Sequence, residues 1–103
     1  MYQISFYVPE PSAEKVKEKM FEAGAGRWGN YDKCSFEYKG IGQFRPIAGS
    51  NPFLGSQGQL EQVAELKVEM ICVEDCLQQV VRALKETHPY ETPAYYITKI
   101  VGH

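Results

Sequence analysis

The chain has 103 residues, a length typical of one domain with a single hydrophobic core. Its formal net charge is -2. Without a run of like charges, the chain lacks the basic face that a dedicated nucleic-acid-binding protein needs. No apolar stretch approaches the roughly 20 residues of a membrane span, and the N-terminus lacks the features of a signal peptide. We therefore expect one cytoplasmic domain over residues 1–103, with its three cysteines reduced.

The first part of the chain predicts a strand followed by a helix. In YQISFYV, apolar side chains alternate with polar ones, which is typical of a half-buried strand, and Pro9 and Pro11 close it. Ser12 is placed to cap the helix that follows. The apolar residues of this helix recur at helical spacing: Ala13, Val16, Met20 and Ala23. Gly24 and Gly26 end the helix, because glycine adopts the left-handed capping conformation at little cost.

The middle of the chain predicts a second strand, a long loop and a third strand. CSFEYKG alternates, with Cys34, Phe36 and Tyr38 on one face. Residues 40–58 contain five glycines and two prolines without any period. Long structureless loops are unusual in small domains, so this loop is a functional candidate. The stretch from Val63 to Cys72 alternates again, with four side chains expected to face inward: Ala64, Leu66, Val68 and Met70.

The last part of the chain predicts a helix and a fourth strand. Asp75 and Gln78 form a capping-box pattern at the start of this helix. An apolar stripe at helical spacing follows: Leu77, Val80, Val81 and Leu84. Thr87-His88-Pro89 ends the helix. The final stretch, AYYITKIV, is a strand whose buried face is ambiguous, because both of its alternating sets are largely apolar.

The predicted elements follow in the order β-α-β-β-α-β. This order predicts a ferredoxin-like α+β fold, in which both helices cover one face of a four-stranded antiparallel sheet. One sheet face and both sheet edges are then left uncovered. Aromatic residues are frequent in the predicted strands, so we expect the open face to contact another copy of the chain.

Two glycine-rich segments, residues 24–31 and 40–58, are the first candidate binding elements. GAGRWG matches the pattern G-x-G-x-x-G, but it follows a helix and precedes a strand, the reverse of what dinucleotide binding requires. Free backbone N–H groups and arginines could still form an anion-binding site. The alternative is a pair of shaped turns with surface arginines. The candidate ligand contacts in these segments are Arg27, Asn30, Tyr31 and Arg45. Loop aromatics are candidates for pocket lining or oligomer packing: Trp28, Tyr31, Phe44 and Phe53.

The motif HPYETP, residues 88–93, is the second candidate site. His88 and Glu91 could polarise a substrate proton or share a metal, with Tyr90 beside them. The two prolines equally predict a rigid corner, in which His88 bonds the last carbonyl groups of the preceding helix. The cysteines match no spacing of a structural zinc site, so we expect neither a metal nor a cofactor.

Several of these motifs resemble, in this order, the inserted domain of YqfO-type proteins: GAGRWGNYDKCSF, GIGQFRPIAGSNPFLG, Glu61, Glu65 and HPYETPAY. HPYETP also resembles the HPYE-x-P signature of the CutA proteins. The resemblance covers nearly the whole chain and implies the ferredoxin-like fold of CutA and the PII signalling proteins. It also implies a homo-trimer with clefts between subunits, with a dimer as the alternative. The domain would stand alone here, without the core domains that carry the metal centre of full-length YqfO-type proteins.

From these observations we expect a non-enzymatic, homo-oligomeric binding or regulatory module. Its ligand would be a small anion in a cleft between residues 24–31 and 40–58, with further contacts from His88, Tyr90 and Glu91. Two alternatives remain open. One is an adaptor that docks a larger protein partner, and the other is a small enzyme that uses His88 with Glu91 or Cys34.

Overall fold

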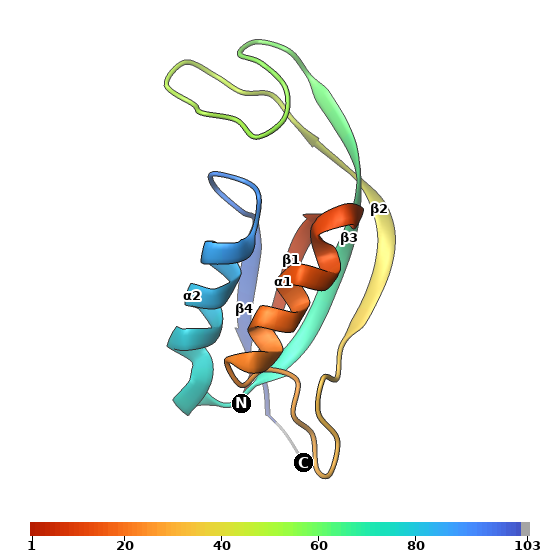
Figure 1. Cartoon of the computed structure of the whole chain (residues 1–103), viewed down its shortest axis with the longest axis vertical. Coiled ribbons are helices and arrows are strands. Elements are labelled where there is room, and N and C mark those ends of the chain that lie inside the picture. Colours follow the sequence, from red (N-terminus) through yellow and green to blue (C-terminus); the bar gives the residue numbers. More distant parts are fainter. Residues whose placement is uncertain (102–103) are drawn as a thin grey trace.

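Four stretches with alternating apolar residues pair into one antiparallel sheet, with both helices on one of its faces (Figure 1). The computed structural model describes residues 1–101. Its elements are β1 (Tyr2–Pro9), α1 (Glu10–Glu22), β2 (Phe36–Phe44), β3 (Glu61–Cys72), the short 3₁₀-helix η1 (Glu74–Cys76), α2 (Leu77–Thr87) and β4 (Tyr95–Lys99). The strands lie in the order β2-β3-β1-β4, and each neighbouring pair is antiparallel. The ferredoxin-like fold predicted from the sequence is confirmed.

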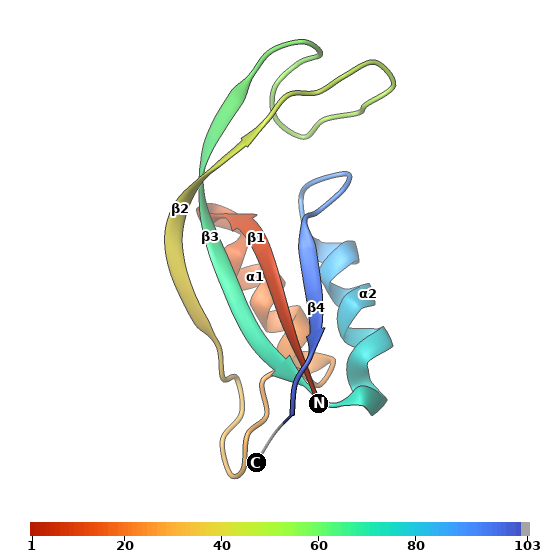
Figure 2. The ribbon, with the colours of Figure 1, turned by 180° about the vertical axis from the view of Figure 1, so that it is seen from behind.

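The hydrophobic core lies between the sheet and the two helices. The central strands β1 and β3 supply alternate side chains to it: Ile4, Phe6, Val8, Leu66, Val68, Met70 and Cys72. The helices supply the opposite wall: Ala13, Val16, Met20 and Phe21 from α1, and Val80 and Leu84 from α2. Burying each larger side chain of this kind stabilises the fold by roughly 1.5–3 kcal/mol. Figure 2 shows the other face of the sheet, which no helix covers.

The predicted helix caps differ from those in the structure. Helix α1 begins at Glu10, so Pro9 stands at its N-cap, and Ser12 lies inside the first turn rather than capping it. Proline is tolerated there, because the first N–H groups of a helix have no intrahelical partner. The capping box predicted from Asp75 and Gln78 is also not formed. The turn η1 precedes α2 instead, and Cys76 stands at the N-cap without a side-chain hydrogen bond.

The largest difference from the prediction is the length of β2 and β3. The second strand was expected to begin near Cys34 and to end at residue 40, but β2 runs from Phe36 to Phe44 and pairs with β3 as far as Glu61. Strand β1 ends at its pairing of Pro9 with Glu65, so β2 and β3 continue past the sheet as a two-stranded ribbon (Figures 1 and 2). No helix lies under this ribbon, which explains its lack of a hydrophobic period.

Two long connecting segments flank β2. The corner segment, residues 23–35, joins α1 to β2, and the pocket segment, residues 45–60, joins β2 to β3. The two segments lie at opposite ends of the molecule (Figure 1). Within residues 1–101, neither helix has the length and apolar character needed to cross a membrane.

Candidate functional site

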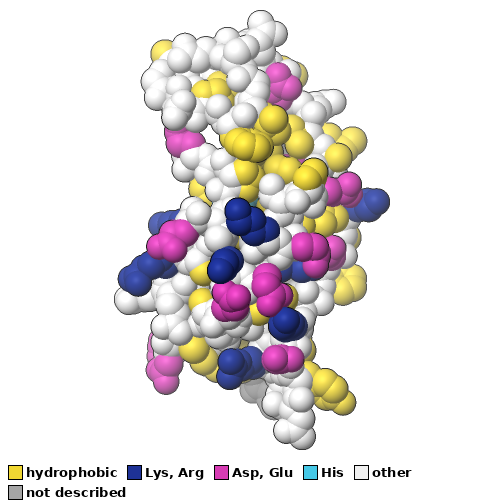
Figure 3. Space-filling view, viewed as in Figure 1, with side chains coloured by type: hydrophobic (Ala, Val, Ile, Leu, Met, Phe, Trp, Pro, Cys, Tyr) yellow, Lys and Arg dark blue, Asp and Glu magenta, His cyan; other side chains and the backbone are white. Residues whose placement is uncertain are grey.

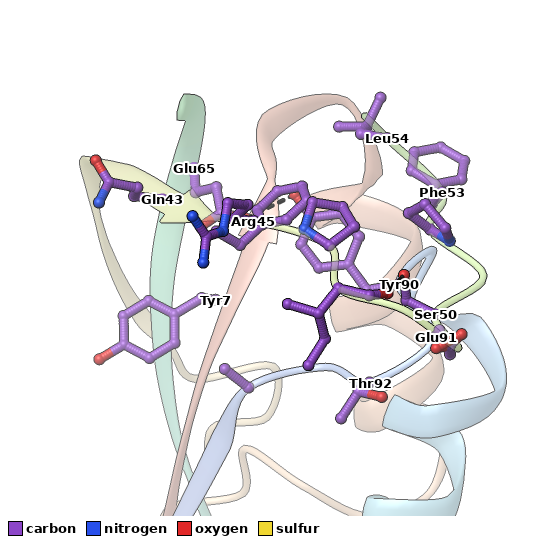
Figure 4. Close-up of a pocket in the computed structure, with 16 residues that line it drawn as sticks. Tyr7, Gln43, Arg45, Ser50, Phe53, Leu54, Glu65, Tyr90, Glu91 and Thr92 are labelled. Carbon is purple, nitrogen blue, oxygen red and sulfur yellow. Dashed lines mark hydrogen bonds between the residues drawn. The ribbon is translucent and has the colours of Figure 1, made fainter. Parts of the chain in front are cut away.

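The pocket segment curls back over the turn that joins α2 to β4, residues 88–94, and borders an open-sided cavity of about 580 Å³ (Figure 4). Most of the cavity wall is apolar or aromatic: Tyr7, Phe44, Pro46, Ile47, Pro52, Phe53, Leu54 and Ala94. Its polar lining comes from Gln43, Arg45, Ser50, Glu65, Glu91 and Thr92, together with the ring of Tyr90. In Figure 3, charged side chains of both signs mix over the helices, and hydrophobic side chains gather above them toward the pocket segment.

His88 fixes the 88–94 turn against strand β1. Its Nδ1 accepts a hydrogen bond from the backbone N–H of Tyr90 at 3.1 Å, so the ring proton lies on Nε2. That Nε2 donates to the backbone carbonyl of Tyr7 at 2.6 Å. Burial lowers the pKa of His88, which favours this neutral ring. His88 therefore supports the cavity from behind, and its ring bonds β1 instead of the helix carbonyls predicted from the sequence.

Tyr90 stands at the centre of the aromatic wall. Its ring centroid lies 5.8 Å from that of Phe44 and 6.3 Å from that of Phe53, so it joins β2 and the pocket segment. Its hydroxyl donates to Oε2 of Glu65 at 2.9 Å. Burial and this acceptor raise the pKa of Tyr90, so the residue stays a neutral donor at physiological pH.

Glu65 is a carboxylate that is only 8% exposed, although it lies on a strand of the sheet. A Cβ atom at Gly42 on the neighbouring strand would overlap this carboxylate. Gly42 does not have a positive φ, so the glycine serves to leave space and not to permit an unusual backbone. Strands β2 and β3 thus hold Glu65 at the floor of the cavity.

The two other charged residues of the cavity differ in their partners. Glu91 accepts from the backbone N–H of Asn51 at 2.7 Å and so ties the pocket segment to the 88–94 turn. Arg45, by contrast, has no carboxylate within ion-pair distance among residues 1–101. The guanidinium is exposed at the cavity and is available to an anion.

The structure brings together only part of the predicted site. Arg45, Tyr90 and Glu91 line one cavity, and His88 lies behind it. Arg27, Asn30 and Tyr31 lie in the corner segment at the opposite end. The cleft expected between residues 24–31 and 40–58 is therefore not formed within one chain, because the β2–β3 ribbon carries the second segment away from the first.

The corner segment has its own geometry. Trp28 and Tyr31 exchange backbone hydrogen bonds of 2.9 and 3.0 Å, which makes a tight exposed hairpin tip. Arg27 and Asn30 are exposed at this tip, and Tyr31 is 74% exposed. Arg27 borders two smaller hollows of about 290 and 180 Å³. Ligand contacts from this end of the molecule stay a prediction.

The residues named for the enzyme alternative have the following partners and positions. Both ring nitrogens of His88 are bonded to backbone groups, and the Glu91 carboxylate is bonded to Asn51. Cys34 lies in the corner segment, far along the molecule from His88. Among residues 1–101, no three His, Cys, Asp or Glu side chains come together in a group that could hold a metal ion.

Sequence reasoning missed several residues of the cavity. From the sequence, Tyr7 is only a residue of the first strand, and Glu65 is only one of the residues that resemble the YqfO-type domain. Neither is predicted to line a binding site. The prediction that loop aromatics line a pocket is fulfilled by Phe44 and Phe53, whereas Trp28 and Tyr31 do not line this cavity. Gly42 lies within β2 beside Glu65, where a glycine allows a close approach, but the sequence placed it in a loop and so gave no local signal.

Sequence and structure comparisons find the same group of longer proteins as relatives of this chain. The chain is 47% identical over 95 residues to a "GTP cyclohydrolase 1 type 2 homolog" of Halalkalibacterium halodurans and 39% identical to that of Bacillus subtilis. Both matches span 92% of this chain but only 26% of each relative. A solved Bacillus cereus protein related to NIF3 superposes with a TM-score of 0.79 at 36% identity, over 93% of this chain and 24% of that one. The resemblance to the inserted domain of YqfO-type proteins is confirmed.

The fold is also shared with proteins of similar size. The CutA1 protein of Pyrococcus horikoshii superposes with a TM-score of 0.71 at 19% identity, over all of this chain and 86% of that one. A PII-like CutA protein of Nostoc gives a TM-score of 0.69 at 16% identity, over 97% of this chain and 81% of that one. No protein-family model matches the chain. The CutA likeness therefore shows the fold, and the chain is similar to about a quarter of the longer YqfO-type relatives.

Proposed function

We propose that this domain is a non-enzymatic binding or regulatory module that holds a small anionic ligand in the cavity beneath the pocket segment. The observation that carries this proposal is Arg45, a cation without an ion-pair partner among residues 1–101, beside an aromatic-walled cavity of about 580 Å³. Apolar cavities with a few placed polar groups are typical of small-molecule sites. The guanidinium would fix the anionic group, and the rings would hold the apolar part.

We also propose that the module is a homo-oligomer, with a trimer favoured over a dimer. The open sheet face supports this, because it carries three large exposed rings: Phe36 (66% exposed), Tyr38 (46%) and Tyr96 (61%). Lys67 lies 5.8 Å from the ring centroids of both Tyr7 and Tyr38 on the same face, which makes an ordered aromatic surface. Native mass spectrometry at micromolar concentration should show the trimer, and a monomer under those conditions would contradict it.

The adaptor hypothesis has weaker support. It requires Phe44 and Phe53 to be free to dock a larger protein partner. Both rings lie beside Tyr90 in the cavity wall, and of the two only Phe53 is largely exposed, at 58%. The geometry around them favours a small molecule in the cavity over a protein on its surface.

The test uses 8-anilinonaphthalene-1-sulfonate, an aromatic anion, titrated into the protein and followed by amide NMR shifts. We expect shifts in residues 42–54 and 90–94. Arg45→Gln should weaken binding roughly tenfold, because hydrogen bonds to charged groups are worth about 1.5–3 kcal/mol. Shifts spread only over the open sheet face, with no effect of Arg45→Gln, would contradict the proposal.

Arg27→Gln is the matched control, since it removes an exposed arginine at the other end of the molecule. If this variant binds the sulfonate with unchanged affinity, the binding site consists of the cavity of one chain. A loss equal to that of Arg45→Gln would mean that the corner segment of a neighbouring copy completes the site, and the predicted cleft would then form between subunits.

A further inference from the structure

Glu65 stands out among the carboxylates of the cavity because it is 8% exposed and has no cationic partner. Among residues 1–101, no lysine or arginine nitrogen lies within ion-pair distance of it. Lys67, two residues along the strand, pairs with Glu69 at 3.7 Å instead. In general, burying a carboxylate is costly unless partners satisfy it, so the partners of this group need an account.

The neighbours of Glu65 satisfy only one side of its carboxylate. The Tyr90 hydroxyl donates to Oε2 at 2.9 Å, and it is the one hydrogen-bond donor to this carboxylate among residues 1–101. Oε1 lies in the space beside Gly42 that a side chain at that position would fill. Among residues 1–101, no fully buried side-chain oxygen lacks a hydrogen-bond partner, so Oε1, which has none, keeps some accessible surface beside the cavity that Gly42 and Glu65 line. A ligand can therefore supply the missing donor.

We infer that Glu65 selects the ligand of the cavity through a donor on the ligand, and that the ligand carries N–H groups on the edge of a flat ring. This inference rests on the proposed function, because it names the chemistry of the same site. The carboxylate accepts the N–H group, as it would from an amidine, a guanidine or an amino-heterocycle. Tyr7, Phe44 and Tyr90 contact the faces of the ring, and Arg45 holds an anionic substituent.

Two features of the chain fit this assignment. Gly40 and Gly42 stand on the strand beside Glu65, Gly40 directly opposite it in the register, so neither places a side chain over the carboxylate. The other titratable neighbours, His88 and Tyr90, are both kept neutral by burial and do not compensate the charge. The cavity thus offers a hydrogen-bond acceptor, Glu65, on its floor and a cation, Arg45, at its side.

The test compares three probes of one shape: benzamidine, benzamide and benzoate. On the same ring they carry a cationic pair of NH₂ groups, one neutral NH₂ group, and a carboxylate without any N–H group. We expect dissociation constants that increase in that order, with shifts in the amide signals of Gly42, Glu65 and Tyr90. This order is measured on the unaltered protein, so it needs no variant that could fail to fold. Benzoate binding more tightly than benzamidine at these residues would overturn the inference.

Glu65→Gln then assigns the effect to the carboxylate. A glutamine oxygen can still accept from Tyr90, while its NH₂ group now opposes a ligand donor. We expect benzamidine to bind at least tenfold more weakly and benzoate to bind no more weakly. The control is Glu69→Gln, which removes a carboxylate from the same strand outside the cavity and should leave all three affinities unchanged. Equal benzamidine affinity in Glu65→Gln and the unaltered protein would overturn the inference.

The outcome also separates this inference from the proposed function. If the anilinonaphthalene sulfonate binds in the cavity through Arg45 while benzamidine does not, the donor requirement is wrong and the anionic site stands. If neither probe shifts the cavity signals, both proposals fail.

Discussion

The corner segment and the pocket segment are both rich in glycine, yet their backbones are bound to the rest of the fold in different ways. In the corner segment, Gly26 donates to the carbonyl of Ile71 on β3 at 2.8 Å, and its own carbonyl accepts from Cys34 at 2.8 Å. Ala25 is buried and donates to Met20 at the end of α1. These bonds fasten the base of the corner segment to both layers of the domain.

The pocket segment makes its backbone hydrogen bonds mostly within itself. Ser50 donates to Ile47 at 3.1 Å, and Gly58 donates to Pro46 at 2.7 Å. Its attachment to the domain runs through the 88–94 turn, by the Asn51–Glu91 bond and the rings around Tyr90. Two segments of similar glycine content are thus held in different ways. Side-chain contacts around the cavity attach the pocket segment, whereas backbone hydrogen bonds to the core attach the corner segment.

The sharpest test of this comparison is alanine at one glycine from each segment. Gly26 has a φ of +80°, and a Cβ there would lie 2.8 Å from the Phe21 ring and 3.0 Å from the backbone nitrogen of Cys34. Gly26→Ala should reduce the free energy of unfolding by about 2–4 kcal/mol, because strained backbone and overpacking add together. Urea unfolding followed by circular dichroism measures this loss.

Gly49→Ala is the matched control in the pocket segment. Gly49 has a φ of +90°, but a Cβ there meets open space. Only the strain of a positive φ applies there, so the free energy of unfolding should fall by about 1–2 kcal/mol. Equal losses at the two positions would show that close packing does not distinguish the segments.

The sequence predicted the helix-backed part of the fold well, because burial against helices imposes a period. Alternation in β1 and in Leu66–Cys72 of β3 corresponds to side chains that are buried. The same logic failed at Ala64, which was expected to face inward and is exposed, since β1 and the helices end before the ribbon reaches it. The hydrophobic pattern therefore does not predict how long a strand is where no helix covers it.

The cavity was predictable only in pieces. Arg45, Tyr90, Phe44 and Phe53 could be named from residue type and loop context, but nothing local places residue 65 beside residue 90. That contact depends on the register of β3 against β1 and on the path of the 88–94 turn. The two glycine-rich segments lie at opposite ends of one chain for the same reason, because the pairing of β2 with β3 carries the second segment away from the first. A cleft between them in an oligomer stays a prediction.

The 88–94 turn offers a second, smaller test, because its attachment depends on a neutral histidine. Burial lowers the pKa of His88 below its ordinary value of 6.5, so the unfolded chain binds a proton there more readily than the folded one. Neutral His88 therefore makes its full contribution to the free energy of unfolding above pH 6.5. This contribution is lost as the pH falls through the folded-state pKa of His88. Protonation also makes Nδ1 a donor, which removes the bond from the Tyr90 N–H.

We expect the urea midpoint to fall between about pH 7.5 and 5.5, and to fall less in His88→Gln, which cannot titrate. The second histidine of the chain is present in both proteins, so the difference belongs to position 88. The protection factor of the Tyr90 amide, which corrects the exchange rate for its intrinsic pH dependence, should fall over the same pH range in the unaltered protein. Parallel pH profiles for the two proteins would mean that the ring does not control the turn.

The smallest effect is expected at the bond that ties the pocket segment to the turn. Both Glu91 oxygens lie within hydrogen-bonding distance of the Asn51 N–H, at 2.7 and 3.3 Å, and the carboxylate is exposed. Glu91→Ala should leave the global unfolding midpoint nearly unchanged, because exposed hydrogen bonds contribute little net stability. Exchange of the Asn51 amide, however, should accelerate roughly fivefold, since local opening of the segment loses its anchor. Glu86→Ala, which removes an exposed carboxylate from α2, should leave that rate as it is. If exchange at Asn51 is equally slow in both variants, the pocket segment is as firmly held as the corner segment, and the contrast between the two ends of the molecule disappears.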